Sequence, residues 1–418
     1  MNSTDGKSYT GALVVLTSLF FIWGLITSLN DILIPHLRAA FELTYTQVML
    51  IQFCFFGAYF VTSLPSGMLV ERVGYKTGIV LGLLMASAGC VLFYPAAGAR
   101  SYPFFLGALF VLASGITLLQ VAANPYVAIL GPQKTASSRL NLTQAFNSLG
   151  TTIGPVLGTS LILAAPAVTG DAGVRAAAEA RAVQGPYLGL AATLCLIAIV
   201  IGLVALPRID AAKSEDSSGI AGPGHDPGSV WSYRPLVLGA IAIFLYVGAE
   251  VSIGSFFVNF VEQPQIAGLP AAVAGAYLSL YWGGAMVGRF VGSFVLRYRK
   301  PGSVLAFNAM AAVILLAVAM VTAGPTAMWA IIAIGLFNSI MFPTIFTLAI
   351  EGLGRRTGEG SGVLCMAIVG GAIVPVAMGW LADHASLLYS FALPLICYLY
   401  IAYYGRRGHR IVPDAVYV

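Results

Sequence analysis

The sequence predicts an all-helical membrane protein in which twelve transmembrane helices form two related halves of six. Of the 418 residues, 59% are hydrophobic and 9% are charged, and the mean hydropathy is +0.89. A soluble domain carries about 25% charged residues because its surface must face water. About twelve apolar segments are long enough to cross a hydrocarbon core of about 30 Å as helices, and a polar insertion divides them six and six.

The apolar runs give the expected helices in chain order. In the first half we expect spans near residues 10–37, 46–70, 77–97, 102–131, 138–165 and 186–206. In the second half we expect spans near residues 234–261, 270–296, 303–323, 327–351, 359–381 and 386–405. No small-residue cleavage site follows the first apolar run, so we expect that run to be retained as a helix.

The polar insertion at residues 207–233 is rich in Gly, Pro, Ser and charge, a composition typical of a linker. It predicts an N-terminal six-helix half at 1–206, a cytoplasmic linker at 207–233 and a C-terminal six-helix half at 234–418. Sixteen Lys and Arg residues fall on one side of the predicted helices and four on the other. By the positive-inside rule, both termini are expected in the cytoplasm.

The two halves resemble copies of one unit. Glycine, arginine and proline residues recur in both at offsets of 218 to 225 residues. The first-half residues Gly67, Arg72, Gly78, Pro125, Gly150 and Pro155 correspond to Gly292, Arg297, Gly302, Pro343, Gly370 and Pro375. A nearly constant offset that agrees with the linker indicates a duplicated six-helix unit.

No catalytic group stands out. The five cysteines lie inside apolar runs without paired spacing, and the four histidines lie at the ends of such runs or outside them. These positions indicate no disulfide framework, metal site or histidine proton relay. No nucleophile grouping or phosphate loop appears beside a span, so we expect neither an enzyme nor a bound cofactor, and no nucleic-acid partner.

Four amides of the stretch from Gly115 to Pro155 are expected at depths in the bilayer where water should be absent. Gln120 and Asn124 are four residues apart, and Gln144 and Asn147 are three apart, so each pair shares a helical face. A buried amide without partners costs about 1 to 3 kcal/mol, which indicates a polar cavity. Each pair has an alternative explanation. Asn124 could bind the backbone carbonyl that Pro125 leaves without a donor. Gln144 and Asn147 could form hydrogen bonds between helices, which stabilise the bundle by about 0.6 kcal/mol a pair.

The segment GMLVERVGYKTG resembles the helix 2 to 3 signature of the major facilitator superfamily. Gly67, Arg72, Gly74 and Lys76 match the signature, whereas Glu71 replaces an aspartate and Tyr75 a basic residue. The resemblance implies a gating role for Gly67, Glu71, Arg72 and Lys76. The alternative is an ordinary basic turn on the cytoplasmic side.

Longer segments resemble the fucose/proton symporter family and, within it, the glucose/galactose transporter subgroup. They are FFIWGLITSLNDILIP, LLQVAANPYVAILGP, RLNLTQAFNSLG and FLYVGAEVSIGSFFVNF. The resemblance implies the major facilitator fold in a monomer of the bacterial inner membrane. It also implies import of a hexose such as glucose or galactose, coupled to Na+ or H+, by alternating access. The alternatives are an uncoupled sugar facilitator, a drug or amphiphile exporter of the same superfamily, or a sugar receptor that transports nothing.

The resemblance implies that Asp31 binds the coupling ion and that the ring of Trp23 stacks on the sugar. The four amides Gln120, Asn124, Gln144 and Asn147 then bind sugar hydroxyls. Fucose-type members carry a proton-bearing glutamate at Gln120, and a glutamine cannot release a proton. The ion is therefore expected at Asp31, as a proton or as sodium held with Asn30, Gln120 and Asn124, and we favour sodium. Alternatively, Asp31 reaches headgroup water and Trp23 is a packing residue.

In the second half, polar and aromatic residues suggest further sugar contacts. We select Glu250 and Asn259 in the seventh span, with Asn338 and Phe342 in the tenth. The last two correspond, in the repeat, to the helix 4 amide pair. Glu250 and Arg289 are the strong acid and base inside this half's spans, and a buried ion pair of this kind is more often architectural.

Overall fold

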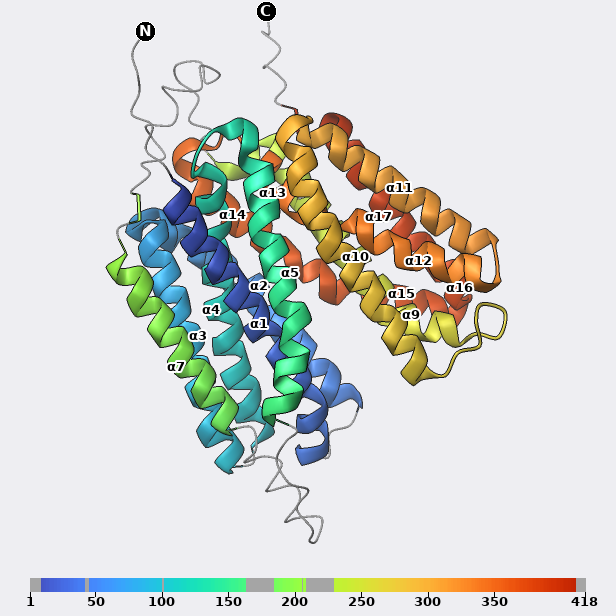
Figure 1. Cartoon of the computed structure of the whole chain (residues 1–418), viewed down its shortest axis with the longest axis horizontal. Helices are drawn as coiled ribbons and strands as arrows, with labels where there is room; N and C mark the ends of the chain where they lie inside the picture. Colours follow the sequence, from blue (N-terminus) through green and yellow to red (C-terminus); the bar gives the residue numbers. More distant parts are fainter. Residues whose placement is uncertain are drawn as a thin grey trace, which may run out of the picture. The chain divides into compact units, whose positions relative to one another are not determined.

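A computed structural model describes the backbone of residues 9–41, 45–99, 101–162, 184–204, 206–207 and 229–410. Within these ranges, the side chains of residues 29–41, 45–49, 155–162 and 271–272 are not described. Every regular element in the described ranges is a helix (Figure 1). The predicted all-α class is therefore confirmed.

The helices follow the apolar runs. The first set comprises α1 (Thr10–Phe41), α2 (Tyr45–Val73), α3 (Tyr75–Ala99), α4 (Tyr102–Ile129), η1 (Gln133–Thr135), α5 (Ala136–Ile162) and α7 (Gln184–Leu203). The second set begins with η3 (Val230–Ser232), α9 (Arg234–Glu262), α10 (Ala271–Tyr298), α11 (Pro301–Val321), α12 (Gly324–Asn338) and α13 (Met341–Ile350). It continues with η4 (Gly354–Arg356), α14 (Thr357–Met366), η5 (Ala367–Val369), α15 (Gly370–His384), α16 (Leu387–Ser390), α17 (Ala392–Tyr403) and the π-helical turn η6 (Tyr404–Gly408).

Twelve segments have the length of a membrane span. Among the described residues, ten helical segments are long and apolar enough to cross a membrane. The helices α5 and α10, with 27 and 28 residues, supply the other two. The twelve-helix prediction is confirmed, and most boundaries agree within a few residues because apolar length directly determines what a bilayer can hold.

Three of the predicted spans contain an internal break that the sequence did not predict, although their outer bounds agree with the described spans within five residues. The tenth span is α12 and α13, separated by Ser339 and Ile340. The eleventh contains the 3₁₀ turn η5 between α14 and α15, and the twelfth is interrupted between α16 and α17. In the tenth span the reason is Pro343, which has no N–H to donate to the carbonyl oxygen of Ser339 four residues earlier.

The chain forms two compact units. The first contains residues 1–136 and 146–214, and the second contains residues 137–145 and 215–418. The first turns of α5 thus belong to the second unit, where Ser137 Oγ lies 2.6 Å from Thr347 Oγ1 and Ser138 donates to the Ser293 carbonyl. In the first unit α3 contacts α4 and α7, and in the second α9 contacts α13, α15 and α17.

Equivalent glycines hold equivalent helices together in the two units. A Cβ atom added to Gly150 of α5 would lie 2.1 Å from the carbonyl oxygen of Phe21 in α1. A Cβ atom added to Gly370, the first residue of α15, would lie 2.0 Å from the carbonyl oxygen of Phe244 in α9. Only glycine permits such close backbone contact, which supports the repeat predicted from the sequence.

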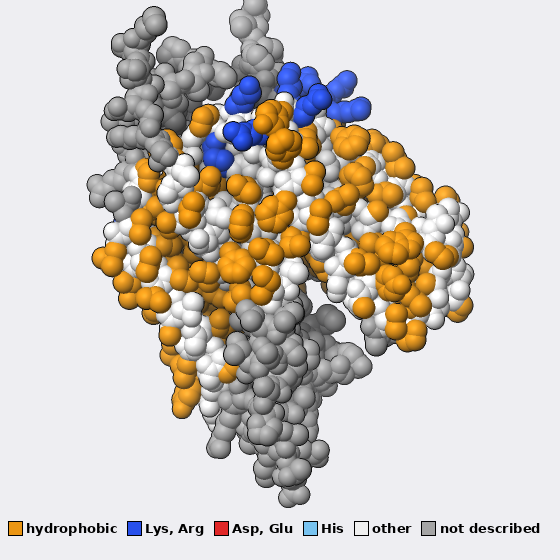
Figure 2. Space-filling view, in the orientation of Figure 1, with side chains coloured by type: hydrophobic (Ala, Val, Ile, Leu, Met, Phe, Trp, Pro, Cys, Tyr) orange, Lys and Arg blue, Asp and Glu red, His pale blue; other side chains and the backbone are white. Residues whose placement is uncertain are grey.

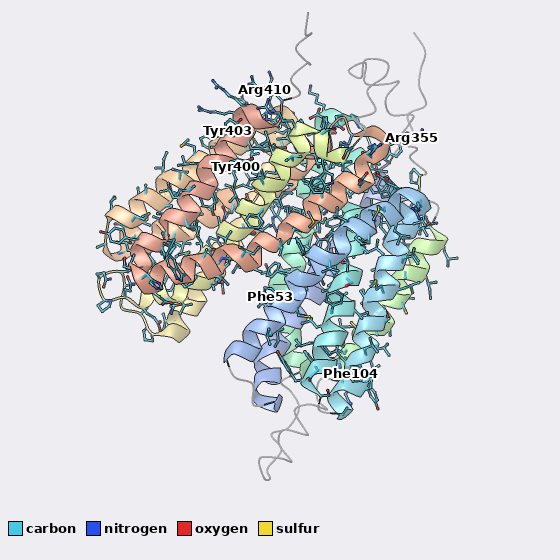
Figure 3. The ribbon with its side chains drawn as sticks, turned by 180° about the vertical axis from the view of Figure 1, so that it is seen from behind. Phe53, Phe104, Arg355, Tyr400, Tyr403 and Arg410 are labelled. Atoms are coloured by element: carbon cyan, nitrogen blue, oxygen red, sulfur yellow. The ribbon has the colours of Figure 1, made fainter. Side chains whose placement is uncertain are left out.

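The helix flanks are hydrophobic, while basic side chains gather at one end of the helices (Figure 2). Phe294, Phe307 and Val321 are among the large apolar side chains with more than half of their surface exposed. Figure 3 places Arg355 and Arg410 at the same end of the second unit. An apolar flank bounded by a basic end is what a helix bundle needs in a bilayer.

Candidate functional site

The helix 4 amides are buried inside the first unit. Gln120 and Asn124 are 8% and 0% exposed, and one helical turn places them on a common face of α4. The Gln120 side-chain nitrogen donates a hydrogen bond to the hydroxyl of Tyr59 in α2. Because an amide carries two N–H donors and a carbonyl acceptor, this bond uses part of what Gln120 can offer a sugar.

The helix 5 amides differ in their surroundings. Gln144 is buried, whereas Asn147 is half-buried and donates from Nδ2 to the carbonyl oxygen of Phe20 in α1 over 3.0 Å. At the same contact, a Cβ atom on Gly24 would lie 2.0 Å from the carbonyl oxygen of Asn147. The donor of Asn147 thus joins α1 to α5, as the interhelical alternative predicts.

Trp23 lies in an apolar environment. The ring is 8% exposed, and its centroid lies 5.3 Å from that of Phe20. It borders a small hollow lined entirely by apolar side chains: Leu19, Ile22, Ile26, Leu83, Ala86, Ile116, Leu119, Leu194 and Ile197. Sugar hydroxyls would find no hydrogen-bond partner there, so this placement favours packing.

The side chains of Asn30 and Asp31 lie outside the described residues, although their backbone belongs to α1. The proposed ion site therefore rests on the sequence alone. Its other two members, Gln120 and Asn124, are the buried α4 amides described above.

The predicted gate lies at a one-residue connection between two helices. Gly67, Glu71 and Arg72 belong to α2, and Lys76 belongs to α3. Gly74 joins the helices with φ of +84°, a conformation that favours glycine. Lys76 Nζ donates to the carbonyl oxygen of Gly202 in α7 over 2.8 Å, which ties this connection to the end of the first unit's last helix.

The second unit contains a group of polar side chains, here called the tyrosine cluster, in which a half-buried acid is surrounded by buried residues: Tyr246, Glu250, Tyr281, Asn338 and Tyr398. Tyr246 donates to Glu250 Oε1 over 2.7 Å, one turn away on α9. Asn338 Nδ2 donates to the Tyr281 hydroxyl over 2.7 Å, and that hydroxyl makes a long 3.5 Å bond to the Glu250 carbonyl oxygen. The Tyr398 side chain approaches Asn338 from α17. The cluster thus joins four membrane segments around one carboxyl group.

Arg289 lies between this cluster and the break in the tenth span. Its Nε donates to the carbonyl oxygen of Ser339 over 3.1 Å, which supplies the donor that Pro343 lacks. The same guanidinium is close enough to act electrostatically on Glu250. One positive charge therefore both stabilises a broken helix and influences the buried acid.

Only two of the four sugar contacts predicted in the second half lie close together in the structure. Glu250 and Asn338 belong to the tyrosine cluster, whereas Phe342 is half-buried against Phe346 with ring centroids 6.0 Å apart. Asn259 is exposed nine residues beyond Glu250 on α9. The arrangement therefore supports Glu250 and Asn338 as neighbours and leaves Asn259 outside the cluster.

Two tyrosines of this cluster, Tyr246 and Tyr398, were not predicted from the sequence. The spacing of Tyr246 four residues before Glu250 was an available signal, because such residues face each other on a helix. Tyr398 gave no signal, since it comes from the last span and a tyrosine in an apolar run is ordinary.

Comparisons with known proteins agree with this architecture. The family model described as Major Facilitator Superfamily matches residues 15–368. A glucose/galactose transporter of Brucella abortus is 58% identical over 98% of this chain and 96% of its own length. The L-fucose-proton symporter of Escherichia coli K12 is 35% identical over 96% of this chain and 94% of its own. A crystal structure of the transporter FucP in the outward conformation superposes with a TM-score of 0.86 at 34% identity, covering 96% of this chain and 99% of that one.

Proposed function

The chain belongs to the Major Facilitator Superfamily, and we propose that it is a symporter that imports a hexose such as glucose or galactose together with a proton. It is a membrane transporter and not an enzyme. The observation that carries the proposal is the 58% identity to a glucose/galactose transporter along nearly the whole of both chains.

A proton is the better-supported coupling ion. The L-fucose-proton symporter is 35% identical to this chain, whereas nothing in the comparisons specifically supports sodium. The preference for sodium rested on the oxygen ligands around Asp31, and these ligands suit a protonated carboxyl group equally well. Asp31 stays a proposed contact for the sugar and the proton, with Asn30 beside it.

The amides are the proposed sugar contacts. Gln120, Asn124 and Gln144 are buried in apolar helices, where each can offer a donor and an acceptor to neighbouring hydroxyls. For Asn147 the proposed sugar contact is the side-chain oxygen Oδ1, because its Nδ2 donates to the Phe20 carbonyl. Such sites alternate between the two sides of the membrane in transporters built from repeats.

The remaining proposals concern location and state. We assign the protein to the bacterial inner membrane as a monomer with both termini in the cytoplasm. The exposed basic residues of the second unit support this orientation, because positive loops stay inside. They include Arg297, Arg299, Lys300, Arg406 and Arg407. The connection around Gly74 is the proposed gate.

The proposal is tested by uptake of radiolabelled glucose into proteoliposomes under three conditions: an inward proton gradient, an inward sodium gradient, and neither. We expect accumulation above the external concentration with the proton gradient alone. Unlabelled galactose should compete with glucose, while mannitol serves as the negative control. Equilibration without accumulation under every gradient would instead identify an uncoupled facilitator.

A further inference from the structure

We propose that Glu250 is a second carboxyl group, besides Asp31, that binds and releases the coupled proton, in an inference that rests on the proposed proton symport. The position of Glu250 sets it apart from the other carboxylates in the described part of the chain. It lies near the middle of the 29-residue helix α9. The other described carboxylates lie at helix ends or in connections: Glu71, Glu262, Glu351, Glu359 and Asp383. An acid in mid-span is costly and is typical of ion or proton pathways.

The surroundings of Glu250 can hold the carboxyl group in either protonation state. The Tyr246 hydroxyl donates to Oε1, and the Arg289 charge acts on the same carboxylate, so the charged form has support. The apolar interior of the bundle opposes that charge and supports the neutral acid. Since Arg289 Nε donates to Ser339, this part of the guanidinium is engaged with the helix break and not with Glu250.

The cluster also contains unused hydrogen-bonding capacity beside the acid. In the described part of the protein, Asn338 Oδ1 and the Tyr398 hydroxyl are buried without hydrogen-bond geometry to any partner, although these two side chains lie close enough to interact with each other. Buried polar atoms of this kind are rare, since each costs free energy unless something pairs with it. A water that delivers the proton would find donors and acceptors at these two side chains, close to Glu250.

The cluster connects the acid to the broken tenth span. Asn338 is the last residue of α12, and its amide binds the Tyr281 hydroxyl, which in turn contacts the backbone of Glu250. A sugar that shifts the α12 to α13 break therefore changes the contacts of Glu250. These hydrogen bonds link the protonation state of Glu250 to the position of α12, and coupling between sugar and proton requires such a link.

The proton step needs no other reactant. The Glu250 carboxylate takes a proton from water on the outer side and becomes a neutral carboxylic acid; on the inner side it returns that proton to water. The described titratable groups that face it are Tyr246 on α9, Tyr281 and Arg289 on α10, and Tyr398 on α17. The other helices that contact α9 carry titratable groups that are not among those acting on Glu250: Glu359 and Cys365 on α14, Asp383 and His384 on α15, and Tyr404, Arg406 and Arg407 on η6, whereas α12 and α13 have none.

The test compares Glu250→Gln with wild type in proteoliposomes. Glutamine keeps the size and an acceptor for Tyr246 but cannot titrate. With a gradient of about one pH unit, one proton per sugar allows wild type to accumulate glucose about tenfold. We expect glucose inside vesicles with Glu250→Gln to reach only the external concentration, and to reach the same level with and without the proton gradient. Glu262→Gln, at the exposed end of the same helix, is the matched control and should accumulate like wild type.

A second variant covers the case in which Glu250→Gln does not fold. Tyr246→Phe removes the hydroxyl that supports the carboxylate. We expect it to transport glucose with the midpoint of its pH profile moved to higher pH, because the charged form has lost a donor. An unmoved profile would contradict the assignment.

The outcomes separate the two proposals. Tenfold accumulation by wild type and by Glu250→Gln alike would overturn the role of Glu250 and leave proton symport intact. Failure of wild type to accumulate sugar under a proton gradient would overturn proton symport itself, and this inference with it.

Discussion

Arg289 Nε donates a hydrogen bond over 3.1 Å to the carbonyl oxygen of Ser339, the acceptor that Pro343 leaves free in the tenth span. In a bilayer no water replaces a missing helical donor, so this side chain is part of the helix break. The predicted pair of Glu250 and Arg289 is thereby refined. Arg289 acts on the acid while it stabilises the neighbouring helix.

Removal of Arg289 should therefore destabilise the second unit. We expect Arg289→Met to lower the free energy of unfolding by about 1 to 3 kcal/mol, the cost of a buried carbonyl without a donor. Thermal unfolding in detergent measures the change. Arg297→Met, at the exposed end of the same helix, is the control and should unfold like wild type. Equal stability of Arg289→Met and wild type would show that Ser339 needs no donor.

The two helix 5 amides should respond differently to alanine. Gln144→Ala should weaken glucose binding about fivefold, since one lost hydrogen bond is worth about 1 kcal/mol. Asn147→Ala should mainly lower the melting temperature, because Asn147 bonds to the Phe20 carbonyl. Binding and unfolding of the purified variants distinguish these effects. A large affinity loss with unchanged stability in Asn147→Ala would place its donor on the sugar.

The equivalent glycines should be equally intolerant of a methyl group. Gly150→Ala and Gly370→Ala each place a Cβ atom near 2 Å from a backbone carbonyl, and overpacking costs about 1 to 3 kcal/mol or more. We expect both variants to express poorly or unfold at lower temperature. Gly275→Ala on α10, where a Cβ atom meets nothing within 4 Å, is the control. Wild-type behaviour of either variant would argue against the backbone contact.

Substitutions of Trp23 distinguish a packing role of its ring from stacking on the sugar. We expect Trp23→Phe to bind glucose within about twofold of wild type and Trp23→Ala to lose about 3 to 5 kcal/mol of stability, as core truncations do. The apolar lining around the ring is the reason. A tenfold loss of affinity in Trp23→Phe, with stability preserved, would restore the stacking role implied by the family resemblance.

The helices were predictable because apolar length and proline placement are local signals. Pro235 and Pro301 begin α9 and α11 at positions where a missing N–H costs nothing. The breaks were not predictable in the same way. Pro125 lies inside the continuous helix α4, whereas its counterpart Pro343 accompanies the separation of α12 and α13. Which outcome occurs depends on tertiary partners such as Arg289, and no local pattern reveals them.

In the candidate site, too, contacts within one helix were predictable and contacts between helices were not. Spacing of three or four residues correctly placed Gln120 with Asn124 on one helical face. The tyrosine cluster draws its members from four spans separated by many residues, so only the folded chain brings them together. A single sequence carries no signal for such contacts.

The most direct test of the central claim is the pH of a lightly buffered, sodium-free suspension of proteoliposomes when glucose is added outside. We predict that the medium becomes more alkaline as sugar and protons enter together, that mannitol has no effect, and that a proton ionophore abolishes the change. Entry of labelled glucose without any change in external pH would contradict proton symport.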